Sequence, residues 1–303
     1  MDAISHALAV VRDKLKKTAY RLDEPMKNHT SFKVGGVVRS VLFPRSARDF
    51  AELCGLLHEH GIRTLIIGNG TNVLINDVLG DMVVIRTIGL YSAKLISENK
   101  ISAGAGMSLT QLAGFAYANG LTGLEFAYGI PGTVGGAVLM NAGAYGSEMK
   151  DIVHSTAAYS PDGGMATITG EQHGFSYRNS RFSDTGDIVV STEIVLQKGD
   201  AHSIREKMDE FDARRRESQP LEKPSAGSTF KRPKDGYAAA LIEQAGLKGC
   251  AIGDAQVSEK HAGFIINRGE ASFKDIMRLI GHVQETVFKQ FGVELEPEVK
   301  IIR

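Results

Sequence analysis

The chain has 303 residues, which is enough to bury a substantial core and to form two or three domains. Its 35 Lys and Arg balance its 35 Asp and Glu, so no net positive field favours binding to nucleic acid or to an anionic membrane. With two cysteines and no CxxC spacing, neither a disulfide framework nor a metal site is expected, and the predicted ligand is a small molecule.

Residues 1–20 have the apolar spacing of an amphipathic helix, and the polar residues 22–30 are expected to be irregular. The apolar run 7–11 is short and is followed, not preceded, by basic residues, which is not typical of a secretory signal. No stretch reaches the roughly 20 apolar residues that cross a bilayer. We therefore expect a cytoplasmic protein without a membrane partner.

Helices and strands alternate from residue 34 onward. Ser46 with Asp49 predicts the capped start of a helix that ends near His60, where Gly61 suits the C-terminal cap. The triplet His58-Glu59-His60 lacks the H-E-x-x-H spacing of a zinc site, so it is interpreted as surface. Strand-like runs follow at 64–67, 73–75 and 82–85.

Three further helical patterns follow beyond residue 100, at 109–119, 201–217 and 273–291. Ser272 with Asp275 caps the last of these, and Gly292 ends it. Strand patterns lie at 155–160 and 187–196. The predicted division is an N-terminal helix and lead-in, two subdomains and a C-terminal domain, with bounds 1–33, 34–97, 98–199 and 200–303.

Two glycine-rich segments are the candidate ligand loops. Residues 68–72, Gly-Asn-Gly-Thr-Asn, let the backbone approach a ligand and turn its N–H groups toward an anion, although a tight turn also explains them. Residues 129–146 hold six glycines in 18 positions, which close approach to a ligand or helix-on-sheet packing explains. No G-x-G-x-x-G fingerprint is present, so any dinucleotide is held by something other than a Rossmann loop.

Seven segments occur in the order found in one protein family, and their combination is far more specific than any one of them. They are NHTSFKVGG, GNGTN, GIPGTVGGAVLMNAGAYG, YRNSRF, SAGSTFKRP, HAGFIIN and LEPEVKII. From residue 28 to 302 the chain resembles the UDP-N-acetylenolpyruvoylglucosamine reductases. The resemblance implies an α+β protein, with a two-part FAD-binding domain of the vanillyl-alcohol-oxidase-like (PCMH) type and a C-terminal α+β substrate-binding domain.

The resemblance also implies the reaction. NADPH reduces the bound FAD, and the enolpyruvyl ether of UDP-N-acetylglucosamine is then reduced to the lactyl ether of UDP-N-acetylmuramate, for peptidoglycan synthesis. A monomer is expected. The residues expected to hold FAD come from both glycine-rich segments: Gly68, Asn69, Gly70, Thr71, Asn72, Gly129, Pro131, Gly132, Gly135, Gly136, Ala137 and Asn141.

Arg178, Ser228 and Glu298 match the catalytic positions of the family. Hydride addition to the enol ether develops negative charge on the neighbouring carbon and on the carboxylate. By the resemblance, Arg178 binds that carboxylate and Ser228 protonates the carbanionic carbon. Glu298 would destabilise the charge if ionised, so we expect it to be neutral or tightly paired. Without the resemblance, Arg178 would be interpreted as a surface arginine, Ser228 as a turn or helix-cap residue and Glu298 as a solvated acid.

Further residues are expected to contact substrate. Lys231 and Arg232 are assigned to the diphosphate, and His261 with Asn267 to the nucleotide or sugar; Tyr177 is the remaining candidate. The arginines at 214–216 either contribute to substrate binding as well or lie at a solvated helix end.

Arg178 and Ser228 are only 50 positions apart. This indicates the shorter class of the family, which lacks the insertion with a tyrosine that closes over substrate, and it leaves open what closes the cleft. Two competing hypotheses are a flavin oxidase with another substrate and a non-catalytic nucleotide-binding module.

Overall fold

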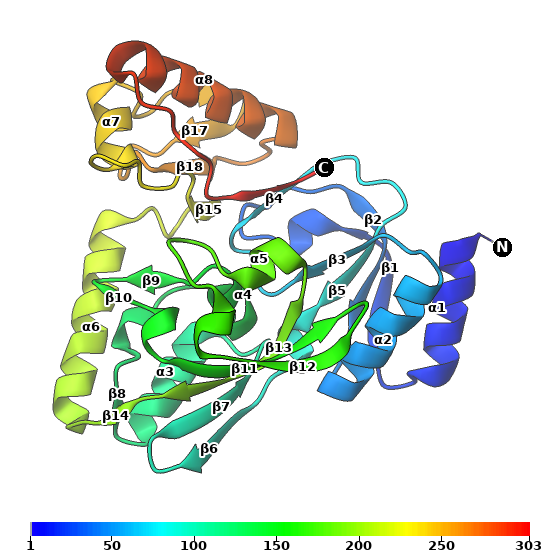
Figure 1. The fold of residues 1–303 in the computed structure, drawn as a ribbon. Helices are drawn as coiled ribbons and strands as arrows, with labels where there is room; N and C mark the ends of the chain where they lie inside the picture. The colour runs from blue at the N-terminus through cyan, green and yellow to red at the C-terminus, as the bar shows by residue number, and fades with distance from the viewer. Residues whose placement is uncertain (1) are drawn as a thin grey trace. The chain divides into compact units, whose positions relative to one another are not determined.

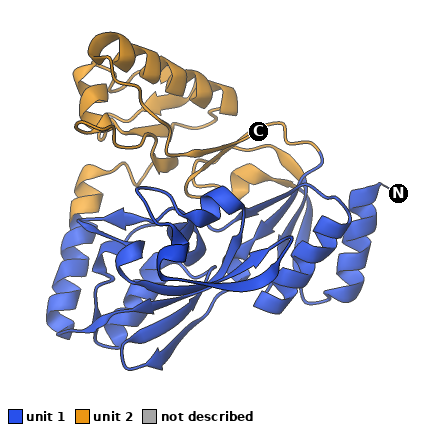
Figure 2. Ribbon diagram, viewed as in Figure 1, with its two compact units in different colours: residues 1–23, 39–69, 81–213 blue, residues 24–38, 70–80, 214–303 orange. Residues whose placement is uncertain are grey.

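The protein consists of two compact units, each assembled from separate stretches of the chain (Figure 2). Unit 1 comprises the residues up to Asp23 with 39–69 and 81–213, and unit 2 comprises 24–38, 70–80 and 214–303. The structure, a computed structural model, describes residues 2–303. Helices and sheets are mixed throughout, as the α+β prediction requires. The finer division at residues 33, 97 and 199 stays a prediction.

A mostly parallel sheet lies at the N-terminal end of unit 1, with strand order β1-β2-β5-β3 (Figure 1). Strands β2 and β3 both run parallel to β5. Helices α1 and α2 share one apolar core with this sheet, through buried residues such as Leu8, Leu53 and Ile85. The bounds are α1 Ala3–Lys14, β1 Ala19–Pro25, β2 Val37–Phe43, α2 Ala47–Glu59, β3 Thr64–Ile67 and β5 Val83–Arg86.

The predicted helix over 1–20 is wrong in its last third, because α1 ends at Lys14. The expectation of irregular structure over 22–30 is also wrong. Strand β1 occupies Ala19–Pro25, and a 3-10 turn follows at Met26–Asn28. Five of the seven β1 residues are exposed, so this edge strand shows no apolar alternation by which to recognise it.

An antiparallel sheet forms the rest of unit 1, with strand order β12-β11-β13-β7-β6. Helices α3 and α4 bury apolar residues against it, including Leu112 and Val138. Its strands are β6 Ala93–Ser97, β7 Lys100–Gly104, β11 Val153–Ser160, β12 Gly164–Thr169 and β13 Ile188–Val195. The helices are α3 Leu109–Ala118, α4 Val134–Leu139 and α5 Arg181–Thr185, and α6 spans Ala201–Ser218. Two small antiparallel pairs are β8 Leu121–Thr122 with β14 Gln197–Lys198, and β9 Gly143–Ala144 with β10 Ser147–Glu148.

Unit 2 contains the antiparallel sheet β15-β18-β17-β16 and the long helix α8. Ser272 and Asp275 form the predicted capping box of α8, and Gly292 ends it in the left-handed conformation, so this helix is confirmed at both ends. A parallel pair, β4 with β19, joins residues far apart in sequence. The bounds are β4 Val73–Ile75, β15 Ser225–Ser228, α7 Ala238–Gln244, β16 Ala251–Ile252, β17 Ala255–Val257, β18 Phe264–Asn267, α8 Phe273–Phe291 and β19 Lys300–Ile302.

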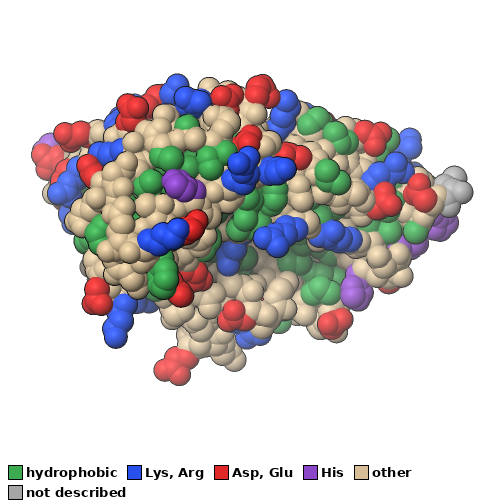
Figure 3. All heavy atoms as spheres, turned by 90° about the horizontal axis from the view of Figure 1, so that it is seen from above, with side chains coloured by type: hydrophobic (Ala, Val, Ile, Leu, Met, Phe, Trp, Pro, Cys, Tyr) green, Lys and Arg blue, Asp and Glu red, His purple; other side chains and the backbone are tan. Residues whose placement is uncertain are grey.

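Charges of both signs are scattered over the face seen in Figure 3, in keeping with the balanced composition. Over residues 2–303, no helix is both long and apolar enough to cross a membrane.

Candidate functional site

In unit 1 the two glycine-rich segments come together. The side-chain amide of Asn69 donates to the backbone oxygen of Pro131 at 2.9 Å. Gly68 lies so close to Thr133 that a Cβ at position 68 would be 2.2 Å from Thr133 Oγ1. Real Cβ atoms do not make such contacts, so only glycine fits here. Residues more than 60 positions apart therefore form one continuous backbone surface at the end of β3.

The backbone of residues 68–72 is rich in unused donors. Of the hydrogen bonds within residues 2–303, none is donated by a backbone N–H of this five-residue run. Consecutive N–H groups without protein acceptors provide binding sites for anionic oxygens such as those of a diphosphate. The run is thus suited to a ligand, beyond what a tight turn alone requires.

The glycines between 129 and 136 have mixed roles. Gly129 has φ +82°, a conformation that glycine adopts without strain, and its N–H donates to Thr110 Oγ1 at 3.2 Å. A Cβ on Gly135 would be 3.0 Å from the Cβ of Ala105, so this glycine lets α4 pack against the neighbouring chain. Gly136 is exposed. The helix-packing explanation therefore holds for Gly135, while the N–H groups of Gly129 and Gly136 bond to the side chains of Thr110 and Thr133.

Asn141 is completely buried and has φ +42°. Its side-chain nitrogen donates to Glu148 Oε2 at 2.8 Å and to the Ser176 oxygen at 3.0 Å, and its Oδ1 accepts from the Lys150 N–H at 2.9 Å. Both amide hydrogens are therefore used inside the protein. The predicted contact of Asn141 with FAD stays a prediction, and its side chain has a structural function in addition.

Arg178 lies in a two-residue turn between Ser176 and Asn179, whose backbones form two mutual hydrogen bonds at 3.1 and 3.3 Å. Its φ is +54°, a conformation that costs about 1–2 kcal/mol for a side chain larger than glycine. The guanidinium donates from Nη2 to the Gly143 oxygen at 3.2 Å and lies over the Tyr177 ring, 5.3 Å from its centroid. A strained arginine held in place by neighbours is typical of functional sites.

Ser228 and Glu298 come together in unit 2. Ser228 ends β15 and is exposed, and the next residue, Thr229, accepts from the Glu298 N–H at 2.8 Å. Phe230 and Pro297 form an antiparallel bridge beside them. Residues 228–230 and 296–298 therefore run alongside each other. This local pairing places the two predicted catalytic residues, Ser228 and Glu298, close together.

The second half of the first glycine-rich segment belongs to unit 2 as well. Gly70 has φ +67°, and a Cβ there would lie 2.2 Å from the His29 oxygen. Asn72 donates its side-chain amide to the Glu298 oxygen at 3.2 Å. Ser31 bridges two predicted motifs by donating its hydroxyl to Ser225 oxygen at 2.6 Å. The sequence analysis missed Ser31, although it stands within the NHTSFKVGG segment.

Of the predicted substrate residues in unit 2, Lys231 pairs with Glu296 at 2.5 Å and Arg232 stacks on Tyr237, 4.3 Å from the ring centroid. His261 is half-buried, and burial lowers its pKa, so it favours the neutral form. Asn267 is buried; it donates to the Phe32 oxygen at 3.1 Å and accepts from two backbone N–H groups. Its bonds hold the chain that follows β18.

Tyr177 is exposed beside Arg178 in unit 1. Arg215, near the end of α6, is buried, so the arginines at 214–216 do not all lie at a solvated helix end. The roles assigned to these residues stay predictions.

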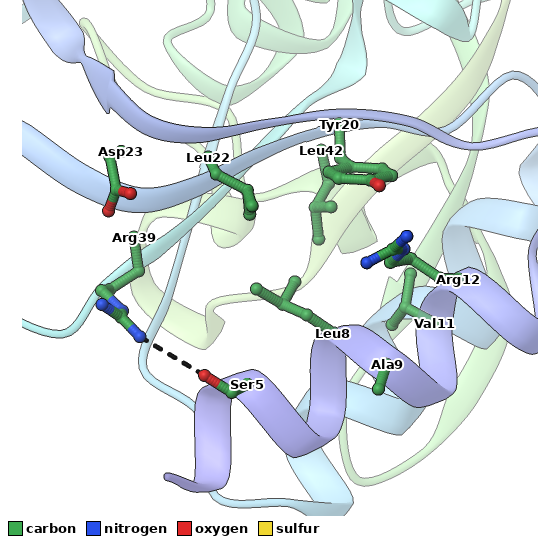
Figure 4. A pocket seen from close by; sticks show the side chains of 10 residues that line it. All are labelled: Ser5, Leu8, Ala9, Val11, Arg12, Tyr20, Leu22, Asp23, Arg39 and Leu42. Carbon is green, nitrogen blue, oxygen red and sulfur yellow. Dashed lines mark hydrogen bonds between the residues drawn. The ribbon is translucent and has the colours of Figure 1, made fainter. Parts of the chain in front are cut away.

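A separate pocket of about 220 Å³ lies between α1, β1 and β2 (Figure 4). Leu8, Leu22 and Leu42 form its apolar part, with Arg12 and Arg39 at its edge. No residue predicted to bind cofactor or substrate lines it.

Comparison with known families identifies two matching models. Residues 38–169 match a family described as an FAD binding domain, and residues 219–302 match the C-terminal domain of UDP-N-acetylenolpyruvoylglucosamine reductase. The first match includes both glycine-rich segments.

Whole-length relatives carry the same name. The UDP-N-acetylenolpyruvoylglucosamine reductase of Caldanaerobacter subterraneus is 46% identical over 292 residues, which is 96% of both chains. That of Clostridioides difficile is 46% identical and covers 95% of both. The crystal structure of the Thermus caldophilus reductase matches with a TM-score of 0.80 at 32% identity, over 95% of this chain and 99% of the other. Phl p 4.0202, a glucose dehydrogenase, shares the fold over 65% of this chain and 44% of its own, with a TM-score of 0.52 and 11% identity.

Proposed function

This chain belongs to the UDP-N-acetylenolpyruvoylglucosamine reductase family, a family of flavin-dependent oxidoreductases, and from that premise we propose its reaction in detail. It reduces UDP-N-acetylglucosamine enolpyruvate to UDP-N-acetylmuramate for peptidoglycan synthesis, with NADPH as the electron donor. We further propose that it acts as a monomer in the cytoplasm.

One observation supports FAD as the cofactor above all others: two segments of the FAD-binding match meet in unit 1 and present unused backbone donors. Gly68 and Asn69 contact the loop that contains Pro131, and the N–H groups of 68–72 have no acceptor within residues 2–303. These donors suit the diphosphate of FAD. When bound, FAD supplies the hydride that it has received from NADPH.

Arg178 binds the carboxylate of the enolpyruvyl group. Hydride addition spreads negative charge onto that carboxylate, and a planar guanidinium with several donors stabilises the charge better than an ammonium does. The strained turn supports this role, because it holds the side chain against Gly143 oxygen and Tyr177. Tyr177 is then placed to contact substrate beside it.

Ser228 donates the proton that completes the reduction, since the carbanionic carbon is a strong base and requires only a well-placed hydroxyl. Glu298 is held next to this serine by its backbone bond to Thr229. An ionised carboxylate there would destabilise the developing charge, so we propose that Glu298 acts in its neutral form or is tightly paired with a cation. Lys231, Arg232, His261 and Asn267 are proposed to bind the nucleotide part.

Stopped-flow absorbance of the bound flavin tests the function. The purified protein should be yellow; NADPH should bleach the flavin, and the enolpyruvyl substrate should restore its colour. In Ser228→Ala, bleaching by NADPH should be unchanged and recovery at least tenfold slower. Ser97→Ala, at an exposed serine that ends β6, is the matched control.

Three outcomes contradict the proposal in different ways. A colourless protein indifferent to FAD would indicate a non-catalytic module. Rapid reoxidation by oxygen, with no response to the enolpyruvyl substrate, would indicate a flavin oxidase. Recovery at the wild-type rate in Ser228→Ala would remove this serine from the proton transfer.

A further inference from the structure

A closed ring of contacts in unit 1 connects Asn141 to Arg178. Asn141 donates to Glu148 Oε2 and to the Ser176 oxygen. Glu148 is paired with Gly143 across the β9–β10 hairpin, and the Gly143 oxygen accepts from Arg178. Ser176 begins the two-residue turn in which Arg178 lies, which completes the ring.

The side chain of Asn141 contacts both supports of the arginine. Through Ser176 it holds the turn that sets the backbone of Arg178, and through Glu148 it holds the hairpin that accepts from the guanidinium. Gly143 admits no substitute, because a Cβ there would lie 2.6 Å from the Glu148 Cβ and from the Ser147 oxygen. The spacing between hairpin and turn is therefore tightly defined.

The hairpin is also fixed at its tip. The Tyr145 ring stacks on Phe211 of α6, with 4.2 Å between centroids, and its hydroxyl donates to the Phe211 oxygen at 3.0 Å. The hairpin cannot follow Arg178 if the turn moves, so the bond from Asn141 to Ser176 determines where the guanidinium lies.

We propose that Asn141 is a positioning residue for Arg178, which it holds by bonding the turn and the hairpin at the same time. Buried hydrogen bonds of this kind orient functional side chains without contacting the reactants. The inference rests on the proposed role of Arg178 as the group that binds the substrate carboxylate. It assigns Asn141 to the arginine, where the family resemblance suggested FAD.

Asn141→Asp is the most direct perturbation, because it keeps the shape of the side chain. An ionised aspartate has no hydrogen to donate, so the bonds to Glu148 and Ser176 are both lost, and the new carboxylate faces that of Glu148. Asn141→Gly removes the same amide and keeps the positive φ, since glycine adopts it freely. The control is Asn99→Asp, at an exposed asparagine in the β6–β7 turn.

Two ligands separate positioning from general damage. The enolpyruvyl substrate carries the carboxylate that Arg178 binds, and UDP-N-acetylglucosamine lacks it. Binding of each is followed by the change in the spectrum of oxidised flavin. In Asn141→Asp and Asn141→Gly, we expect the dissociation constant of the enolpyruvyl substrate to rise at least tenfold. That of UDP-N-acetylglucosamine and the rate of flavin reduction by NADPH should stay within twofold of the wild type.

A rescue and a double variant complete the test. Glu148→Gln added to Asn141→Asp restores one hydrogen bond with donor and acceptor exchanged, and should recover part of the lost affinity. Arg178→Ala should raise the same dissociation constant, and adding Asn141→Gly to it should cause little further loss, because coupled residues are not additive.

The outcomes distinguish the two proposals. If Arg178→Ala binds the enolpyruvyl substrate like the wild type, the assigned role of Arg178 fails. If Arg178→Ala weakens binding and the Asn141 variants do not, the positioning role is wrong. Equal weakening for both ligands, or loss of bound flavin, would show that Asn141 only supports the fold or contacts the cofactor.

Discussion

Gly68→Ala tests whether the contact between the two glycine-rich segments is needed for FAD binding. The added Cβ would lie 2.2 Å from Thr133 Oγ1 and 3.1 Å from Thr133 Cβ and Cγ2. Thr133 is 2% exposed and β-branched, so it has little freedom to rotate away. The loops must separate, and the bond from Asn69 to Pro131 lengthens or breaks.

The magnitude follows from these two effects. Overpacking costs about 1–3 kcal/mol, and a lost hydrogen bond costs about 0.5–1.5 kcal/mol. Together they amount to about 1.5–4.5 kcal/mol, so the dissociation constant of FAD should rise more than about tenfold. The assay is titration of the apoprotein with FAD, followed by quenching of flavin fluorescence, with urea unfolding measured in parallel.

Two comparisons decide this prediction. Gly114→Ala, within α3, has no atom within 4 Å of the added Cβ and should bind FAD like the wild type. Thr133→Ala removes Oγ1 and Cγ2, so the double variant with Gly68→Ala should recover part of the affinity. The reasoning is refuted if Gly68→Ala binds FAD with wild-type affinity, or if Gly114→Ala weakens binding equally.

Four further predictions concern stability and reactivity. Gly281→Ala within α8 should raise the free energy of unfolding in urea by about 0.5–1 kcal/mol, because nothing lies within 4 Å of the new methyl group; a decrease would contradict the helix packing. Ser272→Ala should lower it by about 1 kcal/mol through loss of the capping box, and an unchanged midpoint would show that the cap contributes nothing. Burial raises the pKa of the Cys54 thiol to about 12, so at pH 8 Ellman's reagent should modify only Cys250 in the native protein and both thiols in guanidinium; fast modification of Cys54 in the native state would be inconsistent with this burial. Burial also lowers the pKa of His173, so the unfolded chain binds a proton that the folded one resists. Stability should be level above about pH 6.5 and fall as the pH drops from there toward the folded pKa, below which His173 causes no further loss. His173→Gln should reduce that slope in urea titrations at pH 5 and 7, whereas an equal slope would assign the effect to other groups.

Elements with local signals were predictable from the sequence. Helix α8 carries its own start and stop in Ser272, Asp275 and Gly292, and both ends agree with the structure. Strand β1 carries no such signal, because its residues are mostly exposed at the edge of a sheet. A local sequence pattern predicts an element that local contacts determine, such as α8. Strand β1 depends instead on pairing with the neighbouring strand, which its own sequence does not reveal.

The sequence proposes the residues of the site and does not reveal their geometry. The adjacency of Ser228 and Glu298 results from a backbone bond across 69 residues, from Glu298 to Thr229, which no spacing reveals. The positive φ of Arg178 and the use of the Asn141 amide inside the protein are likewise properties of packing. Asn141 stands in a glycine-rich segment, which predicts a ligand contact, and the structure adds the hydrogen bonds that its side chain makes inside the protein.

The pairing of β4 with β19 has a consequence for biosynthesis. Strand β4 needs a partner that is translated 227 residues later, as Val73 with Lys300 shows, and the core of unit 2 combines Phe32 and Leu74 with residues from 226 onward. Unit 1 has all of its segments once residue 213 has been made, so it can fold while the ribosome is still at work. Unit 2 must wait for Ile302, and until then Leu74 and Phe32 have no completed core to enter. Premature release before residue 300 should therefore leave a folded unit 1 attached to an unfolded remainder.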